Sequence, residues 1–145
     1  MKKIILILIL FSAFAVFGED VRKGVLTVTI KNLRSDGGTV RVTLFNSKDG
    51  YPSKVEKALT KVFLKISNKT ATAQFKDLPF GTYAIGVFHD ENGNGKVDTN
   101  FIGMPTEGFG ASNDAKGSFG PPSFQDASFK MEWIKKTLVI NAVYP

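Results

Sequence analysis

The segment Gly81-Thr-Tyr-Ala-Ile-Gly-Val-Phe88 decides the fold class of this chain. It is the most apolar stretch after the first eighteen residues, and it runs directly into a segment rich in Asp, Asn and Gly. Short apolar runs that contain β-branched and aromatic residues and end at turn-forming residues are typical of buried strands. We therefore predict a central β-strand over residues 81–88, with a tight loop directly after it.

Alternation of apolar and polar residues with a period of two predicts further strands on both sides of this segment. Val25 to Leu33 and Thr39 to Phe45 flank the turn Ser35-Asp-Gly-Gly38, so we predict a β-hairpin there. A second pair is expected around Ser67 to Lys69, and two more strands follow near the C-terminus. These four are Lys61 to Ile66, Thr70 to Phe75, Ser128 to Trp133 and Thr137 to Val143. Seven short strands predict an all-β fold, a single immunoglobulin- or transthyretin-like sandwich.

Residues 1–18 have the three parts of a secretory signal peptide. Two lysines precede an apolar run over residues 4–17, and small residues permit cleavage after Gly18 or after Ala15. An uncleaved membrane anchor needs about 18 to 20 apolar residues, and this run is one or two short. We therefore predict export to the periplasm or outside the cell, with no transmembrane segment after cleavage.

Composition limits the remaining residues, 19–145, to one ordinary domain of about 125 residues. The chain has no cysteine, so neither a disulfide nor a lipidated N-terminus is possible, and stability must come from the core or from bound ions. The formal charge is +6, but Lys2 and Lys3 leave with the leader and the other lysines are scattered. This pattern indicates a solvated surface, and we predict no nucleic-acid binding.

The segment from His89 to Asn100 spaces oxygen-bearing side chains in the pattern of a calcium loop. With Asp90 at position 1 of a twelve-residue loop, Gly95 falls at position 6, where the chain must turn sharply. Positions 3, 5, 7 and 9 are then Asn92, Asn94, Lys96 (through its carbonyl) and Asp98. Position 12 is Phe101 instead of a bidentate glutamate, and a strand precedes the loop, so the segment is not an EF-hand. It is similar to the strand-flanked Asp-x-Asn-x-Asn-Gly-x-x-Asp loops of secreted β-sandwich repeats, which bind calcium.

An alternative interpretation is that Asn92-Gly93 and Asn94-Gly95 only form a tight hairpin turn. Such a turn needs one Asn-Gly pair and no acid at either end. The acids Asp90, Glu91 and Asp98 against Lys96 leave a local charge of about −2 in a basic protein, which a divalent ion would neutralise. We therefore expect a structural Ca²⁺ ion here.

His89 is the only histidine of the chain, and it precedes the first expected calcium ligand. No Gly-x-Ser-x-Gly motif and no cysteine accompany it, so we predict no catalytic residue. A tetrahedral zinc site with one histidine and no cysteine would need three carboxylate ligands, so a zinc site is not expected. We expect His89 to end the central strand and to form local hydrogen bonds.

Residues 104–127 form a long segment rich in Gly, Pro, Phe and Asn, without alternation. Connections of this length are generally functional or disordered, and exposed phenylalanines disfavour disorder. One interpretation is a lid in which Phe109, Phe119 and Phe124 pack over one end of the sandwich. The other is the wall of a ligand site beside the ion, with Tyr51 and Pro52 opposite. Its lining would be Tyr51, Phe109, Asn113, Phe119 and Phe124.

Several of these motifs together resemble known families. Phe75-Lys-Asp-Leu-Pro79 followed by Gly81-Thr-Tyr83 resembles the strand-turn-strand of transthyretin-like and carboxypeptidase-regulatory-like sandwiches. Three longer stretches are similar to the bacterial DUF2141 family of exported proteins, and this likeness covers nearly all of the chain from Val25 to Val143. The three are Ala84 to Gly103, Glu107-Gly-Phe-Gly-Ala-Ser-Asn113 and Phe119-Gly-Pro-Pro-Ser-Phe124. The resemblance implies a sandwich fold and no particular mechanism.

Together these features predict an exported, non-catalytic sandwich that binds calcium and presents a loop to a ligand or partner, such as an envelope protein or a polysaccharide. A purely structural envelope protein is the first alternative. The second is a calcium-supported hydrolase of extracellular polymers, which would need a pair of carboxylates such as Glu107 and Asp126 facing a cleft.

Overall fold

The structure is a computed structural model that describes residues 21–145. The predicted signal peptide and both cleavage positions lie outside the described residues. Within the described part, no helix has the length and apolar character needed to cross a bilayer.

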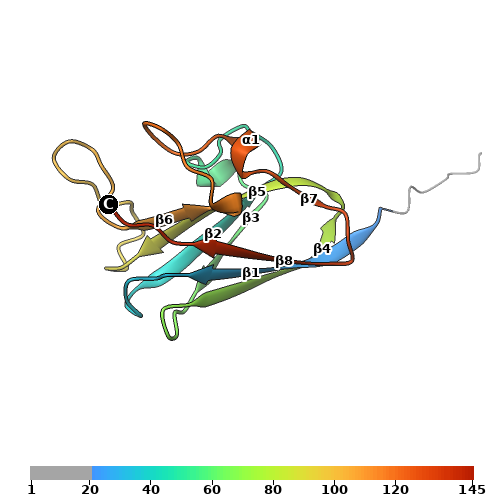
Figure 1. Cartoon of the computed structure of the whole chain (residues 1–145), viewed down its shortest axis with the longest axis horizontal. Helices are drawn as coiled ribbons and strands as arrows, with labels where there is room; N and C mark the ends of the chain where they lie inside the picture. Colours follow the sequence, from blue (N-terminus) through green and yellow to red (C-terminus); the bar gives the residue numbers. More distant parts are fainter. Residues whose placement is uncertain (1–20) are drawn as a thin grey trace, which may run out of the picture.

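Residues 21–145 form eight strands in two sheets, packed as two layers (Figure 1). The smaller sheet has the order β4-β1-β8, with β1 and β8 parallel and β1 and β4 antiparallel. Its strands are β1 (Lys23–Lys31), β4 (Ala71–Pro79) and β8 (Lys135–Asn141). The larger sheet has the order β3-β2-β5-β6, and β7 pairs with the first residues of β5. Its strands are β2 (Thr39–Phe45), β3 (Thr60–Leu64), β5 (Gly81–Asp90), β6 (Gly108–Ala111) and β7 (Phe129–Met131).

The predicted central strand is confirmed as β5, which pairs with β2 through residues 84–90 and with β7 and β6 on its other edge. Its residues Tyr83, Ile85 and Val87 contribute to the main core, which lies between the two sheets. On the opposite face, Ala84 joins a small cluster with Ala111 and Ala127. Both faces of β5 are therefore covered, which explains the continuous apolar run in the sequence.

Three short helices lie in the connections between the strands: η1 (Val55–Lys57), η2 (Ser112–Asp114) and α1 (Phe124–Ala127). The hydroxyl of Ser123 caps α1 by accepting a hydrogen bond from the backbone N of Asp126 at 3.1 Å. Helices η2 and α1 belong to the long segment after β6, and they lie beside the outer face of β5.

The predicted hairpin between the first two strands is wrong, because β1 and β2 belong to different sheets. Asn32 adopts a positive φ of 60°, and the buried Leu33 donates its backbone N–H to Lys69 at 3.2 Å. The connection therefore crosses the end of the core instead of reversing within one sheet. The predicted pair around Ser67 to Lys69 is also wrong, since β3 pairs with β2 while β4 pairs with β1.

The predicted number of seven strands misses β6, which lies in the segment expected to be a loop. Its sequence contains Gly108 and Gly110, and glycine weakens any strand signal. Close packing explains Gly108, since a Cβ atom there would lie 2.4 Å from the Tyr144 ring. The backbone of β6 thus approaches a partly buried aromatic ring that a larger residue would displace.

We predict that Gly108→Ala lowers the free energy of unfolding by about 1–3 kcal/mol, because the new methyl group overlaps the Tyr144 ring. Gly120→Ala is the matched control, since a Cβ atom there meets no atom within 4 Å, and its effect should stay within about 0.5 kcal/mol. Urea unfolding followed by far-UV circular dichroism measures both values. Equal stabilities of the two variants would contradict this packing.

Candidate functional site

The candidate ion loop begins at Asp90, the last residue of β5, whose side chain is 6% exposed. One carboxylate oxygen of Asp90 accepts a hydrogen bond from the backbone N of Asn94 at 3.1 Å. The other accepts from the backbone N of Gly95 at 2.7 Å. Gly93 and Gly95 adopt φ of 71° and 75°, which glycine tolerates without strain. The Asp-x-Asn-Gly-Asn-Gly spacing thus wraps the chain around the first carboxylate.

Asn92 and Asn94 bind backbone N–H groups of the loop through their side-chain oxygens, and their amide nitrogens face Asp98. The side-chain oxygen of Asn92 accepts from the backbone N of Asn94 at 3.1 Å, and that of Asn94 accepts from Lys96 at 2.8 Å. The amide nitrogens of both asparagines donate to the carboxylate of Asp98, that of Asn94 at 2.9 Å. The structure therefore brings together Asp90, Asn92, Asn94 and Asp98 in one small loop, while the Lys96 side chain is exposed.

Glu107 closes this loop from outside, a role that no pattern in the sequence indicates. Its carboxylate is 5% exposed and accepts from the backbone N of Glu91 at 2.9 Å and from that of Asp98 at 3.2 Å. One buried acid thus holds both ends of the loop. Its position just before β6 brings it here, because β6 pairs with the end of β5 that carries Asp90.

An ion pair between Arg34 and Glu91 flanks the loop. The guanidinium donates to both carboxylate oxygens, and these hydrogen bonds hold the pKa of Glu91 below its usual range. Arg34 also donates to the backbone oxygen of Thr106 at 3.3 Å, so it links the loop to the segment before Glu107. The negative charge of Glu91 is therefore paired, while Asp90, Asp98 and Glu107 are in no ion pair within residues 21–145.

His89 is fully buried and has a partner at each ring nitrogen. Its Nε2 lies 2.8 Å from the carbonyl oxygen of Gly37, which only accepts, so Nε2 carries the proton. Its Nδ1 lies 2.6 Å from the Tyr144 hydroxyl oxygen, which accepts a hydrogen bond from the backbone N of Arg34 at 2.9 Å. His89 lies one residue before the end of β5 at Asp90, and the expected local hydrogen bonds are wrong, because its partners are more than fifty residues away.

The five predicted ligand-site residues do not form one wall. Tyr51 and Phe124 lie edge to face with ring centroids 5.8 Å apart, over the alanine cluster on β5. The Tyr51 hydroxyl donates to the backbone oxygen of Ile85 at 3.2 Å, and burial raises its pKa. Asn113 donates to the backbone oxygens of Asp126 and Ser128, so it has a structural role. Phe109 is partly exposed on β6, and Phe119 is fully exposed.

Glu107 and Asp126, the carboxylates of the hydrolase alternative, have separate partners. Glu107 accepts from two backbone amides, as described above. Asp126 is exposed and accepts a hydrogen bond from the Ser123 hydroxyl at 2.7 Å. Each acid thus stabilises its own loop or helix.

Comparison with known proteins gives one match. The family model DUF2141, described as "Uncharacterized protein conserved in bacteria", matches residues 28–138. The chain belongs to the DUF2141 family. No curated protein and no solved structure matches it. The match spans β1 to the middle of β8, so the loop, Glu107 and the helices over β5 all lie within the DUF2141 region.

We predict that Glu107→Gln lowers the free energy of unfolding by about 1–3 kcal/mol. The glutamine retains one acceptor oxygen but presents an NH₂ group to the second backbone amide, which loses its partner. Glu56→Gln is the control, because Glu56 is exposed on η1. Hydrogen exchange of the Glu91 and Asp98 amides should accelerate only in the Glu107 variant. Unchanged exchange at both amides would contradict the closing role of Glu107.

Proposed function

We propose that this DUF2141 protein is an exported, non-catalytic β-sandwich that binds one Ca²⁺ ion through residues 90–98 and presents ordered surfaces to a ligand or partner. The observation that carries the proposal is the convergence of Asp90, Asn92, Asn94 and Asp98 in a loop closed by Glu107. The order of these residues matches positions 1, 3, 5 and 9 of a calcium loop. The backbone carbonyl of Lys96 would supply position 7.

The present hydrogen bonds leave lone pairs of the loop oxygens free to bind a cation. Each oxygen of the Asp90 carboxylate accepts one N–H group and retains a further lone-pair direction. The side-chain oxygens of Asn92 and Asn94 each accept one hydrogen bond and can also bind an ion. Oxygen ligands of this mixed kind are those that Ca²⁺ takes in proteins.

The kind of ligand limits the affinity. Within the described residues, no group of three or more His, Asp or Glu side chains is arranged to hold a metal. The ion would depend on two carboxylates together with amide and backbone oxygens. Affinity should therefore resemble that of extracellular calcium modules, on the order of 10⁻⁴ to 10⁻³ M. Such an ion would be structural and would not act as a switch.

The ion would fix the segment that follows the loop, a short hairpin over residues 98–106. Its base is closed by a hydrogen bond from the backbone N of Thr106 to the Asp98 oxygen at 2.9 Å, and Thr99 bridges Pro105. The side-chain oxygen of Asn100 holds the tip by accepting from the backbone of Ile102 and Met104.

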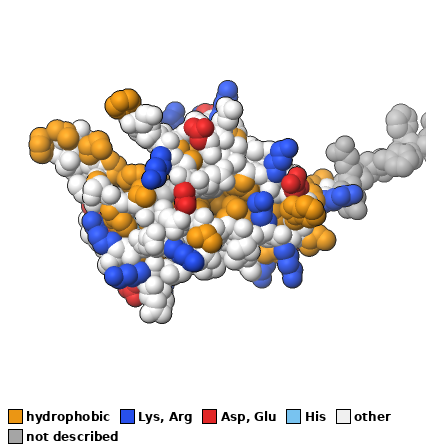
Figure 2. Space-filling model, viewed as in Figure 1, with side chains coloured by type: hydrophobic (Ala, Val, Ile, Leu, Met, Phe, Trp, Pro, Cys, Tyr) orange, Lys and Arg blue, Asp and Glu red, His pale blue; other side chains and the backbone are white. Residues whose placement is uncertain are grey.

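The tip of this hairpin is apolar and open to solvent. Phe101 is 99% exposed, and Ile102 and Met104 are also largely exposed. Figure 2 shows hydrophobic side chains at the end of the loop that projects at the left of the molecule. Exposed apolar groups on an ordered segment are typical of contact sites for another molecule. This surface supports a binding function.

We predict that 5 mM CaCl₂ raises the melting temperature relative to EDTA by roughly 5 °C, as expected when the ion is at about ten times its dissociation constant. Asp98→Asn should abolish this rise, because it removes one of the two ligand charges while keeping the side-chain shape. Differential scanning calorimetry gives both temperatures, and Glu56→Gln is the control. No rise with calcium, or an equal rise in the Asp98 variant, would contradict the proposal.

A further inference from the structure

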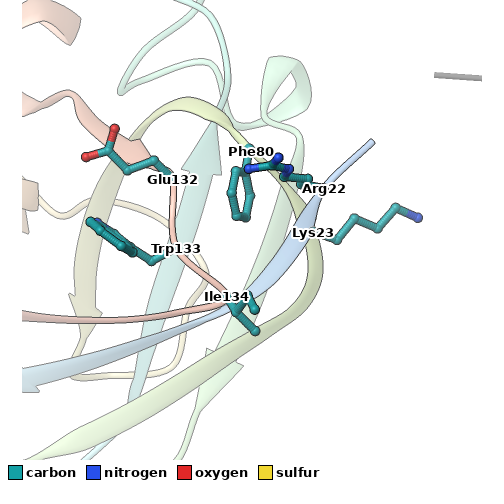
Figure 3. A pocket seen from close by; sticks show the side chains of 6 residues that line it. All are labelled: Arg22, Lys23, Phe80, Glu132, Trp133 and Ile134. Carbon is teal, nitrogen blue, oxygen red and sulfur yellow. The ribbon is translucent and has the colours of Figure 1, made fainter. Parts of the chain in front are cut away.

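A second candidate site lies at the other end of β5, about 30 Å along the strand from Asp90. It is an open cleft of about 450 Å³ formed by three segments that are distant in sequence: the start of β1, the residue before β5, and the connection between β7 and β8 (Figure 3). Its lining residues are Arg22, Lys23, Phe80, Glu132, Trp133 and Ile134.

Backbone contacts hold the walls of this cleft in place. The backbone N of Phe80 donates to the Arg22 oxygen at 2.8 Å, and that of Val25 donates to the Ile134 oxygen at 2.8 Å. Gly24 permits the close approach of β1 to the segment with Trp133 and Ile134, because a Cβ atom at Gly24 would lie 2.5 Å from the Trp133 backbone oxygen. The Trp133 side chain is therefore carried on a fixed backbone, and the cleft is formed before any ligand arrives.

The apolar side chains of the cleft remain open to solvent. Trp133, the single tryptophan of the chain, is 64% exposed, and Ile134 is 73% exposed. In Figure 3 the Trp133 and Phe80 rings lie on the two sides of the segment that carries residues 132–134. Aromatic surface that is held rigid and left uncovered is available to a ligand ring, because stacking and desolvation both favour contact.

Charged groups of opposite sign flank these rings. Figure 3 shows the Arg22 guanidinium beside Phe80, Lys23 extending from the same strand end, and Glu132 next to Trp133 on the other wall. Neither Arg22 nor Glu132 takes part in an ion pair within residues 21–145. A guanidinium at an open cleft is suited to bind a carboxylate with two hydrogen bonds, and a carboxylate accepts hydrogen bonds from hydroxyl groups.

We propose that this cleft binds an acidic sugar residue of a polysaccharide. The C–H face of the sugar ring would lie on Trp133, its carboxylate would face Arg22, and its hydroxyl groups would donate to Glu132. Without Lys2 and Lys3, which leave with the predicted leader, the formal charge is +4, and this positive charge favours an acidic polymer. The proposal specifies a ligand class for the proposed binding function and does not depend on the calcium loop.

Fluorescence tests this proposal directly, because Trp133 is the only tryptophan. We expect a saturable change in its emission when oligogalacturonate is added in EDTA, and no saturable change with a neutral malto-oligosaccharide. Arg22→Gln should weaken binding at least ten-fold through loss of charge-assisted hydrogen bonds. The control Lys65→Gln removes an exposed charge outside the cleft and should bind like the original chain.

Calorimetry with Trp133→Ala completes the test, since this exposed residue can be replaced without loss of the fold, as circular dichroism will verify. We expect no heat of binding from this variant. Several results would overturn the proposal: no response to oligogalacturonate at millimolar concentration, equal binding of the neutral sugar, equal effects of the Arg22 and Lys65 variants, or a response only to an aromatic peptide. Because EDTA is present throughout, failure here leaves the calcium proposal untouched.

Discussion

Strand β5 pairs with β2 on one edge and with β6 and β7 on the other, while its two faces pack against the main core and the alanine cluster. A strand buried in this way cannot shift by one residue without moving its core side chains to the opposite face. Its two ends are therefore fixed points of the molecule. Phe80 at one end forms a wall of the aromatic cleft, and Asp90 at the other anchors the candidate ion loop.

Local sequence patterns predicted where most strands lie, but they did not predict which strands pair with each other. The apolar run over residues 81–88 identified β5 because a doubly covered strand has no alternation. Turn residues such as Gly38 indicated where the chain bends, but a bend does not say whether the next strand stays in the same sheet. The first two strands were therefore paired wrongly, and the glycines of β6 concealed a strand whose backbone must approach Tyr144.

The same limit applies to the candidate sites. The spacing from Asp90 to Asp98 is local, so the sequence predicted that these side chains converge, and the structure brings them together. Glu107 and Arg34 contact the loop only because β6 and the crossover after β1 bring them to it. The sequence around these two residues contains no pattern that predicts this contact. The cleft at Trp133 was also missed, because its walls come from three segments that meet only in the folded chain. Of the predicted lining residues, the structure brings together Tyr51 and Phe124, while Asn113 binds backbone oxygens and both Phe109 and Phe119 are exposed.

The two proposed sites have different roles in binding. An ion at the end of β5 would hold the apolar hairpin over residues 98–106, and the cleft at the start of β5 would take a sugar ring. The most direct test of the central claim is a crystal structure grown in millimolar CaCl₂, with anomalous diffraction locating the ion. We predict a calcium peak bounded by oxygens of Asp90, Asn92, Asn94, Lys96 and Asp98. A loop without such a peak, with both asparagine amides still donating to Asp98, would contradict it.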